Sequence, residues 1–542
     1  MKPTTHQEAA ASPASSGLYT RQATGLVREI GLGPSVALNM SYGSLPFLVL
    51  VATLGPASFP GASPFWAIIF TAAICVFPVL MYGMFVSMMP RSGGDYVFVS
   101  RTIKPWVGFA TNFNLTLWFV LYVAYYAYLI PTFGLSSAFS TIGVAADSQT
   151  MVDWSAAMYE KGWIFAIGVV CLVLVGLLMT VRLATVLKAF VWIFWVSLAG
   201  AILVPVVLLL LNGREDFIAD VARFGGDYDK IIADAKAAGY EGGGSFDFKN
   251  TLLATCLAFG YFAYVIVAPY VGGEVRSPKR TAMYSMLIAL GAGAVMGGTM
   301  MALAQTTFGT EFLGAATYLS NMGDENYPFG APSFFFMFVS MLTTSTPVIV
   351  IISLSFIVGV MITLPAVYLV ATRNIFAWSF DRIMPAKLSE VSPRTHTPLI
   401  ANWVILVITV AFFAYLVFGD SDFLSIFLTT ILAELLSFFV IAVAGIILPF
   451  RRSELYNTSS WSKKPILGIP VLTLVSTLAL GVYALFFYAL ATTDALGANQ
   501  GAGVWATVII AAISIAIYPI AYAINKRRGV DLSLTFKELP PE

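Results

Sequence analysis

Apolar stretches long enough to cross a lipid bilayer recur along the whole chain, separated by short polar segments. A helix of about 20 apolar residues spans the hydrocarbon core. The pattern therefore predicts an all-α integral membrane protein with twelve transmembrane helices. We place the spans at 33–54, 64–89, 105–132, 162–181, 185–211, 250–273, 279–306, 332–380, 398–418, 422–449, 465–490 and 502–525.

Two of these stretches are interrupted by residues that break helices. The first, 33–54, is interrupted at 39–46, which reads Asn-Met-Ser-Tyr-Gly-Ser-Leu-Pro, and the other, 250–273, contains Gly260 and Pro269. Irregular backbone at bilayer depth is tolerated only where it lines a cavity or is buried in protein. Paired breaks in corresponding segments of two halves are typical of the substrate site of a secondary transporter.

The distribution of basic residues predicts the orientation. With the N-terminus placed in the cytoplasm, 23 of the 29 Lys and Arg residues fall inside, as the positive-inside rule requires. Five of the other six lie in the long segment 212–249, and long loops carry little topological weight. We expect a multi-pass protein of the cell membrane with both termini cytoplasmic.

The spans divide into two halves of five. Because five is odd, the second half is inserted upside down relative to the first, which predicts a 5+5 inverted repeat followed by two extra C-terminal helices. The expected organisation is a disordered cytoplasmic tail at 1–24, repeats at 25–211 and 250–450 around an extracellular loop at 212–249, helices 11 and 12 at 451–525, and a cytoplasmic tail at 526–542.

Composition agrees with this architecture and excludes several kinds of site. Of 542 residues, 58% are hydrophobic and 11% are charged, against about 25% charged in a soluble domain. The three cysteines lie in apolar segments without metal-like spacing, and the two histidines lie in loops or tails. We therefore expect no metal, no cofactor and no enzymatic activity. The expected partners are the lipid bilayer and a small molecule, not nucleic acid.

Four stretches resemble the amino acid–polyamine–organocation (APC) permeases. Residues 89–96 read Met-Pro-Arg-Ser-Gly-Gly-Asp-Tyr, and 273–280 read Gly-Glu-Val-Arg-Ser-Pro-Lys-Arg. The connection 381–398 contains Asp-Arg-Ile-Met-Pro and ends on Thr-Pro, and 31–46 resembles the family's broken first helix. The resemblance implies a LeuT-like fold with broken helices 1 and 6 and an amino acid as substrate.

The chain departs from the family pattern at three places. Where many members have an acidic residue in the sixth helix, 260–266 reads Gly-Tyr-Phe-Ala-Tyr-Val-Ile. The region 190–197 lacks the lysine that occupies a sodium-like site in some members, and 433–435 reads Ala-Glu-Leu instead of Gly-Thr-Leu. The identity of the coupling ion is therefore open: a proton is favoured over sodium, which the hydroxyls of 343–346 could otherwise help to bind.

Residues at the two breaks are the candidate substrate site. Backbone N–H groups at the start of the outer half-helix suit a carboxylate, and freed carbonyls suit an ammonium group. Glycine allows close approach of the backbone, and serine adds a hydroxyl donor. The predicted substrate-binding residues are Asn39, Met40, Ser41, Tyr42, Gly43, Ser44, Phe259, Gly260, Phe262, Ala263 and Tyr264.

Five further residues are candidates for coupling or gating. Glu434 is an acid within a span and therefore a functional hypothesis, to be weighed against a structural hydrogen bond between helices. Tyr122 and Tyr126 share one helix face, where a gating position on the substrate pathway and an interface belt are both open. Glu274 and Asp381 lie near the inner ends of spans. Their expected partners in an inner gate are Arg91, Arg101, Arg276 or Arg382.

Taken together, the sequence predicts a transporter that alternates access around a midplane site. A small neutral or hydrophobic amino acid is the favoured substrate, since Glu434 is the one charged group expected near the site. Transport or exchange of a cationic amino acid or polyamine is the alternative. An amino-acid sensor on a transporter scaffold is the alternative outside transport.

Overall fold

The computed structural model describes residues 28–242, 245–395, 397–419, 423–459, 465–499 and 501–528, together with 532 and 536. The predicted N-terminal tail, 1–24, lies outside the described residues, as does most of the predicted C-terminal tail. His396 and the basic pair at 463–464 lie outside them too.

The described chain is built from α-helices and contains no β-strand, which confirms the predicted fold class. The helices of the first half are α1 (Leu32–Gly43), α2 (Leu45–Ser58), α3 (Pro64–Met88), α4 (Gly94–Thr102), α5 (Pro105–Leu129), α6 (Ser136–Ala145), α7 (Gln149–Ala157), α8 (Lys161–Leu178), α9 (Leu183–Leu211), α10 (Arg214–Arg223) and α11 (Tyr228–Ala237).

The second half continues in the same way. Its helices are α12 (Phe248–Phe262), α13 (Pro278–Thr307), α14 (Thr310–Met322), α15 (Phe335–Met341), α16 (Thr346–Phe380), α17 (Leu399–Phe418), α18 (Phe423–Arg451), α19 (Ser453–Tyr456), α20 (Val471–Thr492) and α21 (Gly501–Arg527). Eleven helices in the described residues are long and apolar enough to cross a membrane, counting α1 with α2 and α5 with α6 as one each.

Both predicted breaks are present. At the first, α1 ends at Gly43 and α2 begins at Leu45, because Ser44 has φ 64° and ψ 117°, outside the helical region. At the second, α12 ends at Phe262 and the chain runs without helix through 263–277, called the extended segment below. The predicted span 250–273 is therefore helical only in its first part, which is why eleven long helices stand against twelve predicted spans.

Two other predicted spans differ in detail. The stretch 332–380 is split into α15 and α16, because residues 342–345 leave the helix. The span 105–132 continues beyond its predicted end through a π-helical turn, Ile130–Leu135, into α6. Pro131 lies in this turn and has no N–H to donate, so the wider turn accommodates it without ending the helix.

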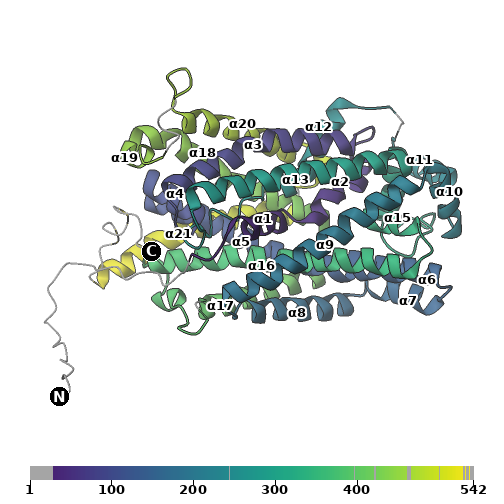
Figure 1. The fold of residues 1–542 in the computed structure, drawn as a ribbon, viewed down its shortest axis with the longest axis horizontal. Helices are drawn as coiled ribbons and strands as arrows, with labels where there is room; N and C mark the ends of the chain where they lie inside the picture. Colours follow the sequence, from purple (N-terminus) through teal and green to yellow (C-terminus); the bar gives the residue numbers. More distant parts are fainter. Residues whose placement is uncertain are drawn as a thin grey trace, which may run out of the picture.

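Segments predicted on one side of the membrane lie at one end of the molecule. In Figure 1, α4 and α19 lie toward the end at which the C-terminus is marked, whereas α6, α7, α10 and α11 lie toward the other. Between the predicted spans, the segment 90–104 contains α4 and the segment 307–331 contains α14. Bulky apolar side chains on the outer helices, such as Trp192 of α9 and Trp505 of α21, are largely exposed, as expected for a surface that contacts lipid.

Candidate functional site

The two breaks meet in the centre of the helical bundle. A Cβ atom built on Gly43 would lie 2.8 Å from the carbonyl oxygen of Tyr261 and 3.1 Å from its ring. Only glycine allows this approach between the end of α1 and the end of α12. The close approach that Gly43 allows in the structure is to the second break itself.

The residue at the first break is held by two neighbouring helices. The hydroxyl of Ser44 accepts a hydrogen bond from Thr363 of α16 at 3.4 Å, and Tyr126 of α5 interacts with the same side chain. Ser44 itself is buried. These contacts from α5 and α16 fix the position from which α2 starts.

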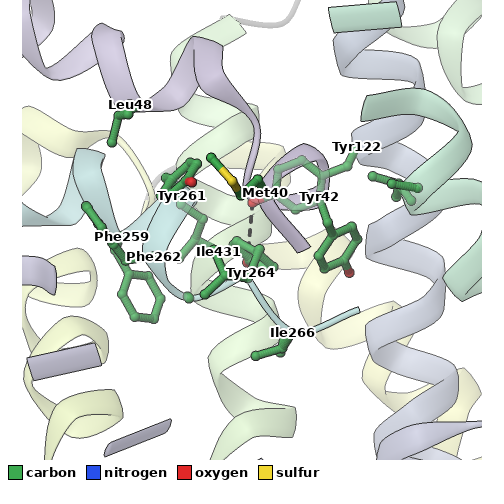
Figure 2. Close-up of a cluster of buried hydrophobic side chains, with 14 of the residues drawn as sticks. Met40, Tyr42, Leu48, Tyr122, Phe259, Tyr261, Phe262, Tyr264, Ile266 and Ile431 are labelled. Carbon is green, nitrogen blue, oxygen red and sulfur yellow. Dashed lines mark hydrogen bonds between the residues drawn. The ribbon is translucent and has the colours of Figure 1, made fainter. Parts of the chain in front are cut away.

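A buried acid faces the break. Glu434 of α18 is fully buried, and its carboxylate accepts a hydrogen bond from the hydroxyl of Tyr264, in the extended segment. Tyr122 donates in turn to the Tyr264 hydroxyl at 3.4 Å, which is the dashed line in Figure 2. The ring of Tyr126 stacks on that of Tyr122, with centroids 6.2 Å apart. Three of the five coupling candidates thus lie together beside the two breaks.

Several polar atoms at this place lack a partner from the chain. Tyr42 packs edge-on against Phe119 and Tyr264, with ring centroids 5.5 and 5.9 Å away. The hydroxyls of Tyr42 and Ser41 and one carboxylate oxygen of Glu434 are buried without a hydrogen-bond partner in the described part of the protein. Because buried polar atoms are nearly always hydrogen-bonded, these three atoms are available to a polar ligand or to water.

Two other predicted site residues, Asn39 and Phe259, contact other parts of the protein. The Asn39 side chain donates to Ser285 of α13 at 3.0 Å and accepts from the Ala268 N–H at 3.1 Å, so it ties α1 to the extended segment. Phe259 packs on Phe486 of α20, with ring centroids 4.0 Å apart. In Figure 2, Phe259 lies on the far side of the cluster from Tyr42.

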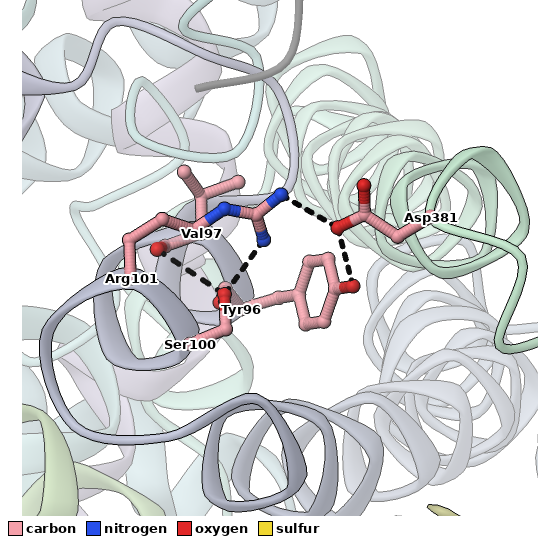
Figure 3. A network of polar contacts seen from close by, with 5 residues as sticks. All are labelled: Tyr96, Val97, Ser100, Arg101 and Asp381. Carbon is pink, nitrogen blue, oxygen red and sulfur yellow. Dashed lines mark hydrogen bonds and ion pairs between the residues drawn. The ribbon is translucent and has the colours of Figure 1, made fainter. Parts of the chain in front are cut away.

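The other two coupling candidates belong to a separate network, toward the end of the molecule that holds α4. Asp381 accepts hydrogen bonds from Arg101 and from Tyr96, both at 2.6 Å (Figure 3). Glu274 forms a two-point ion pair with Arg373, at 2.6 and 2.9 Å. All four charged side chains are buried. Arg101 was one of the expected partners, whereas Arg373 was not.

Besides Arg373, three residues that contribute to these sites were not singled out from the sequence. Thr363 and Ser285 are single hydroxyls inside apolar helices, a pattern that ordinary helix packing also produces. Asp95, in the first turn of α4, is a fully buried carboxylate bonded by Tyr270. Its signal was visible, since it is the acidic residue of the stretch 89–96.

The site has no grouping that suggests a metal centre. The described residues contain no cluster of three or more His, Cys, Asp or Glu side chains that could hold a metal ion. What the geometry offers instead is a helix start, a helix end, several buried hydroxyls and one carboxyl, which can bind a small zwitterion.

Comparison with known proteins agrees with this description. A family model described as "Amino acid permease" matches residues 34–516, which include both breaks, the Glu434 cluster and the two buried ion pairs. A search of curated proteins gives no significant match.

Proposed function

The chain belongs to the amino acid permease family, a family of the APC superfamily, and from this premise we propose a secondary transporter that alternates access around the two breaks. Its substrate in this proposal is a small neutral or hydrophobic amino acid. The observation that carries the proposal is the group of buried, unpartnered polar atoms of Ser41, Tyr42 and Glu434 beside the breaks.

The carboxylate of the substrate is placed at the start of α2. The side chain of Ser44, the residue before α2, makes no cap hydrogen bond, and the first turn of α2 contains no acidic residue. The positive end of the helix dipole and its N–H groups therefore favour an anion there. The unpartnered hydroxyl of Ser41 supplies a further donor.

The ammonium group and the side chain of the substrate take the opposite side. The last carbonyls of α12, at the negative end of its dipole, suit a cation. The surrounding side chains of Met40, Tyr42, Phe262 and Tyr264 are apolar or aromatic, which favours a neutral or hydrophobic side chain. The second oxygen of Glu434 supports the alternative substrate, a cationic amino acid or polyamine, since it could bind a further positive group.

Glu434 is the proposed site of a coupling proton. Within the described residues its hydrogen-bond partner is the neutral hydroxyl of Tyr264 and no cationic side chain pairs with it, and an acid at bilayer depth is a candidate to carry a coupling ion. Because Tyr264 lies in the extended segment, gain or loss of this proton changes a hydrogen bond at the second break. We propose a proton rather than sodium as the coupling ion.

The ion pairs at the end of the molecule that holds α4 form the proposed inner gate. Arg101 with Asp381 joins α4 to the end of α16, and Glu274 with Arg373 joins the extended segment to α16. These contacts must separate for the site to open on that side. The twelve spans with inverted halves, the cell-membrane location and the cytoplasmic termini complete the proposal.

Thermal stabilisation of the purified protein tests the substrate class. Neutral amino acids, cationic amino acids and polyamines are each added at pH 5.5 and 7.5, with and without sodium. A ligand that binds only the folded protein at about 100 times its Kd stabilises it by about 2.7 kcal/mol. We expect stabilisation by a neutral amino acid, and stabilisation by cationic ligands alone would contradict the proposed substrate.

The same assay tests the role of Glu434. In Glu434→Gln we expect a neutral amino acid still to bind, while uptake into vesicles loses its dependence on a proton gradient, because glutamine cannot take up the proton. Glu241→Gln, at an exposed position, is the matched control and should behave as wild type. Gradient-driven uptake that persists in Glu434→Gln would remove the coupling role.

A further inference from the structure

Asp95 is a buried carboxyl outside the central site. It lies in the first turn of α4 and is 0% exposed. Buried carboxylates are normally paired with a cation. The two buried arginines of this region pair with other acids, Arg101 with Asp381 and Arg373 with Glu274, and in the described chain Asp95 forms no ion pair.

The groups that face Asp95 are neutral phenols from four elements. Tyr270 of the extended segment donates to one carboxylate oxygen at 2.5 Å, and the other oxygen has no partner within the described chain. The hydroxyl of Tyr82, from α3, lies near the same carboxyl. Tyr42 of α1 and Tyr483 of α20 are close enough to interact electrostatically with Asp95. No lysine or arginine is among these neighbours.

This environment disfavours the charged form of Asp95 near neutral pH. Burial raises the pKa of the carboxyl to about 7, and the hydrogen bond of Tyr270 and the nearby hydroxyl of Tyr82 offset part of that effect. A carboxyl with this pKa exchanges a proton with water over the pH range in which a cell works. A proton can compensate the charge of this carboxylate, which the described neighbours leave without a cationic partner.

The protonation of Asp95 can act on the second break through the chain itself. Tyr270 lies six positions after Tyr264, the partner of Glu434, in the same extended segment. The backbone of this segment is held to α4 as well, since the Gly93 N–H donates to the Tyr270 carbonyl at 3.0 Å. A Cβ atom on Gly94 would lie 2.7 Å from the Tyr270 ring, so the two elements are in close contact.

We propose that Asp95 is a second proton-binding carboxyl of this protein, which takes up and releases a proton toward the α4 end and so controls how the extended segment is held. The charged carboxylate accepts from Tyr270, and the protonated form can donate instead. The proton is taken from water and returned to water. The coupling to transport rests on the proposed function, whereas proton binding by Asp95 does not.

The pH dependence of stability gives a readout that needs no transport. The pKa of Asp95 is raised in the folded protein, so between about 4 and about 7 the folded state holds a proton that the unfolded state has released. Stability therefore falls as pH rises through this window and is constant above it. In wild type the folded-to-unfolded ratio should fall by up to about tenfold per pH unit relative to Asp95→Asn.

Full-length wild type, Asp95→Asn and Asp229→Asn are unfolded with denaturant in detergent at pH 5, 6, 7 and 8, and the infrared carboxyl band is titrated in parallel. Asp229 is exposed and serves as the matched control. In wild type and in Asp229→Asn we expect the additional fall of stability with rising pH and an infrared carboxyl band that titrates near pH 7. In Asp95→Asn we expect neither. Equal slopes and bands in all three proteins would overturn the proposal.

Further measurements distinguish proton binding by Asp95 from its alternatives. Tyr270→Phe removes a hydrogen bond that lowers the pKa of Asp95, so it should move the titration to higher pH, and it tests the proposal even if Asp95→Asn fails to fold. Stabilisation by sodium or potassium that is lost in Asp95→Asn would identify a metal-cation site and overturn proton binding. Absence of uptake by wild type with the titration intact would contradict the proposed function and leave proton binding by Asp95 supported.

Discussion

At the scale of single residues, the contact between Gly43 and Tyr261 decides how closely the two breaks approach. A methyl group at position 43 would meet a backbone carbonyl, which cannot rotate away as a side chain can. We expect Gly43→Ala to lower the free energy of unfolding by about 1–3 kcal/mol and to reduce amino acid binding, because the breaks are forced apart.

Denaturant unfolding and ligand-induced stabilisation measure the two effects. Gly291→Ala in α13 is the matched control, since a Cβ atom there meets open space and alanine favours a helix. Wild-type stability and binding in Gly43→Ala would show that the approach of the two backbones is not needed.

The residue types in the sequence pointed to some members of the candidate site but not to others. Gly43, Ser44, Tyr264 and Glu434 were found because glycine, hydroxyls and an acid are costly or unusual at bilayer depth. The pairing of Glu274 with Arg373 was missed, because the two residues are far apart in the chain and an arginine at the end of a span also fits a topological role. The roles of individual site residues remain predictions.

At the scale of elements, the extended segment is the feature on which most contacts converge. Its backbone is not stabilised by helical hydrogen bonds, so partners from other elements replace them, and Asn39 is one of these. We expect Asn39→Ala to lower the free energy of unfolding by about 1–3 kcal/mol, because the Ala268 N–H is left buried without its partner.

Thermal and denaturant unfolding check this expectation against Asn457→Ala, which removes an exposed asparagine from the segment after α19. Since Asn39 also carries a backbone carbonyl at the first break, ligand binding is measured in the same samples. Equal stability of the two variants would mean that Asn39 does not hold the segment.

The elements themselves were largely predictable, because apolar length alone identifies helices in a membrane and clustered Gly, Pro, Asn and Ser residues interrupt them. The split between α15 and α16 and the π-helical turn after α5 were not predicted. The split lies at a short stretch of hydroxyl residues, Thr343, Thr344 and Ser345, which membrane helices also tolerate. The π-helical turn lies in mostly apolar sequence, where hydropathy cannot distinguish a continuous helix from one that bends.

At the scale of the whole molecule, two buried ion pairs connect α16 to α4 and to the extended segment. Removing one member of a buried pair leaves the other charge uncompensated, at a cost of about 3–5 kcal/mol. We expect Asp381→Asn and Arg101→Gln each to destabilise the protein by about this amount, and the double variant to cost clearly less than their sum, because neither charge is then left alone.

A double-mutant cycle in denaturant unfolding measures this coupling. The half-exposed pair Lys236 and Glu311, at the other end of the molecule, is the matched control and should give a coupling below about 1 kcal/mol. Additive effects of the Arg101 and Asp381 substitutions would argue against the pair as a unit of the inner gate. The arrangement of twelve spans in inverted halves remains a prediction at this scale.

The way the extended segment is held has a consequence for observing the protein at work. Its hydrogen bonds join it to different partners: the Ala268 N–H to Asn39, the Gly93 N–H to the Tyr270 carbonyl, and the Ile30 N–H to the Glu274 carbonyl. In a regular helix, amide hydrogens report only that the helix has frayed. Here the deuterium uptake of each of these three amides reports the separation of one particular pair of elements, so hydrogen exchange can show which contact opens first.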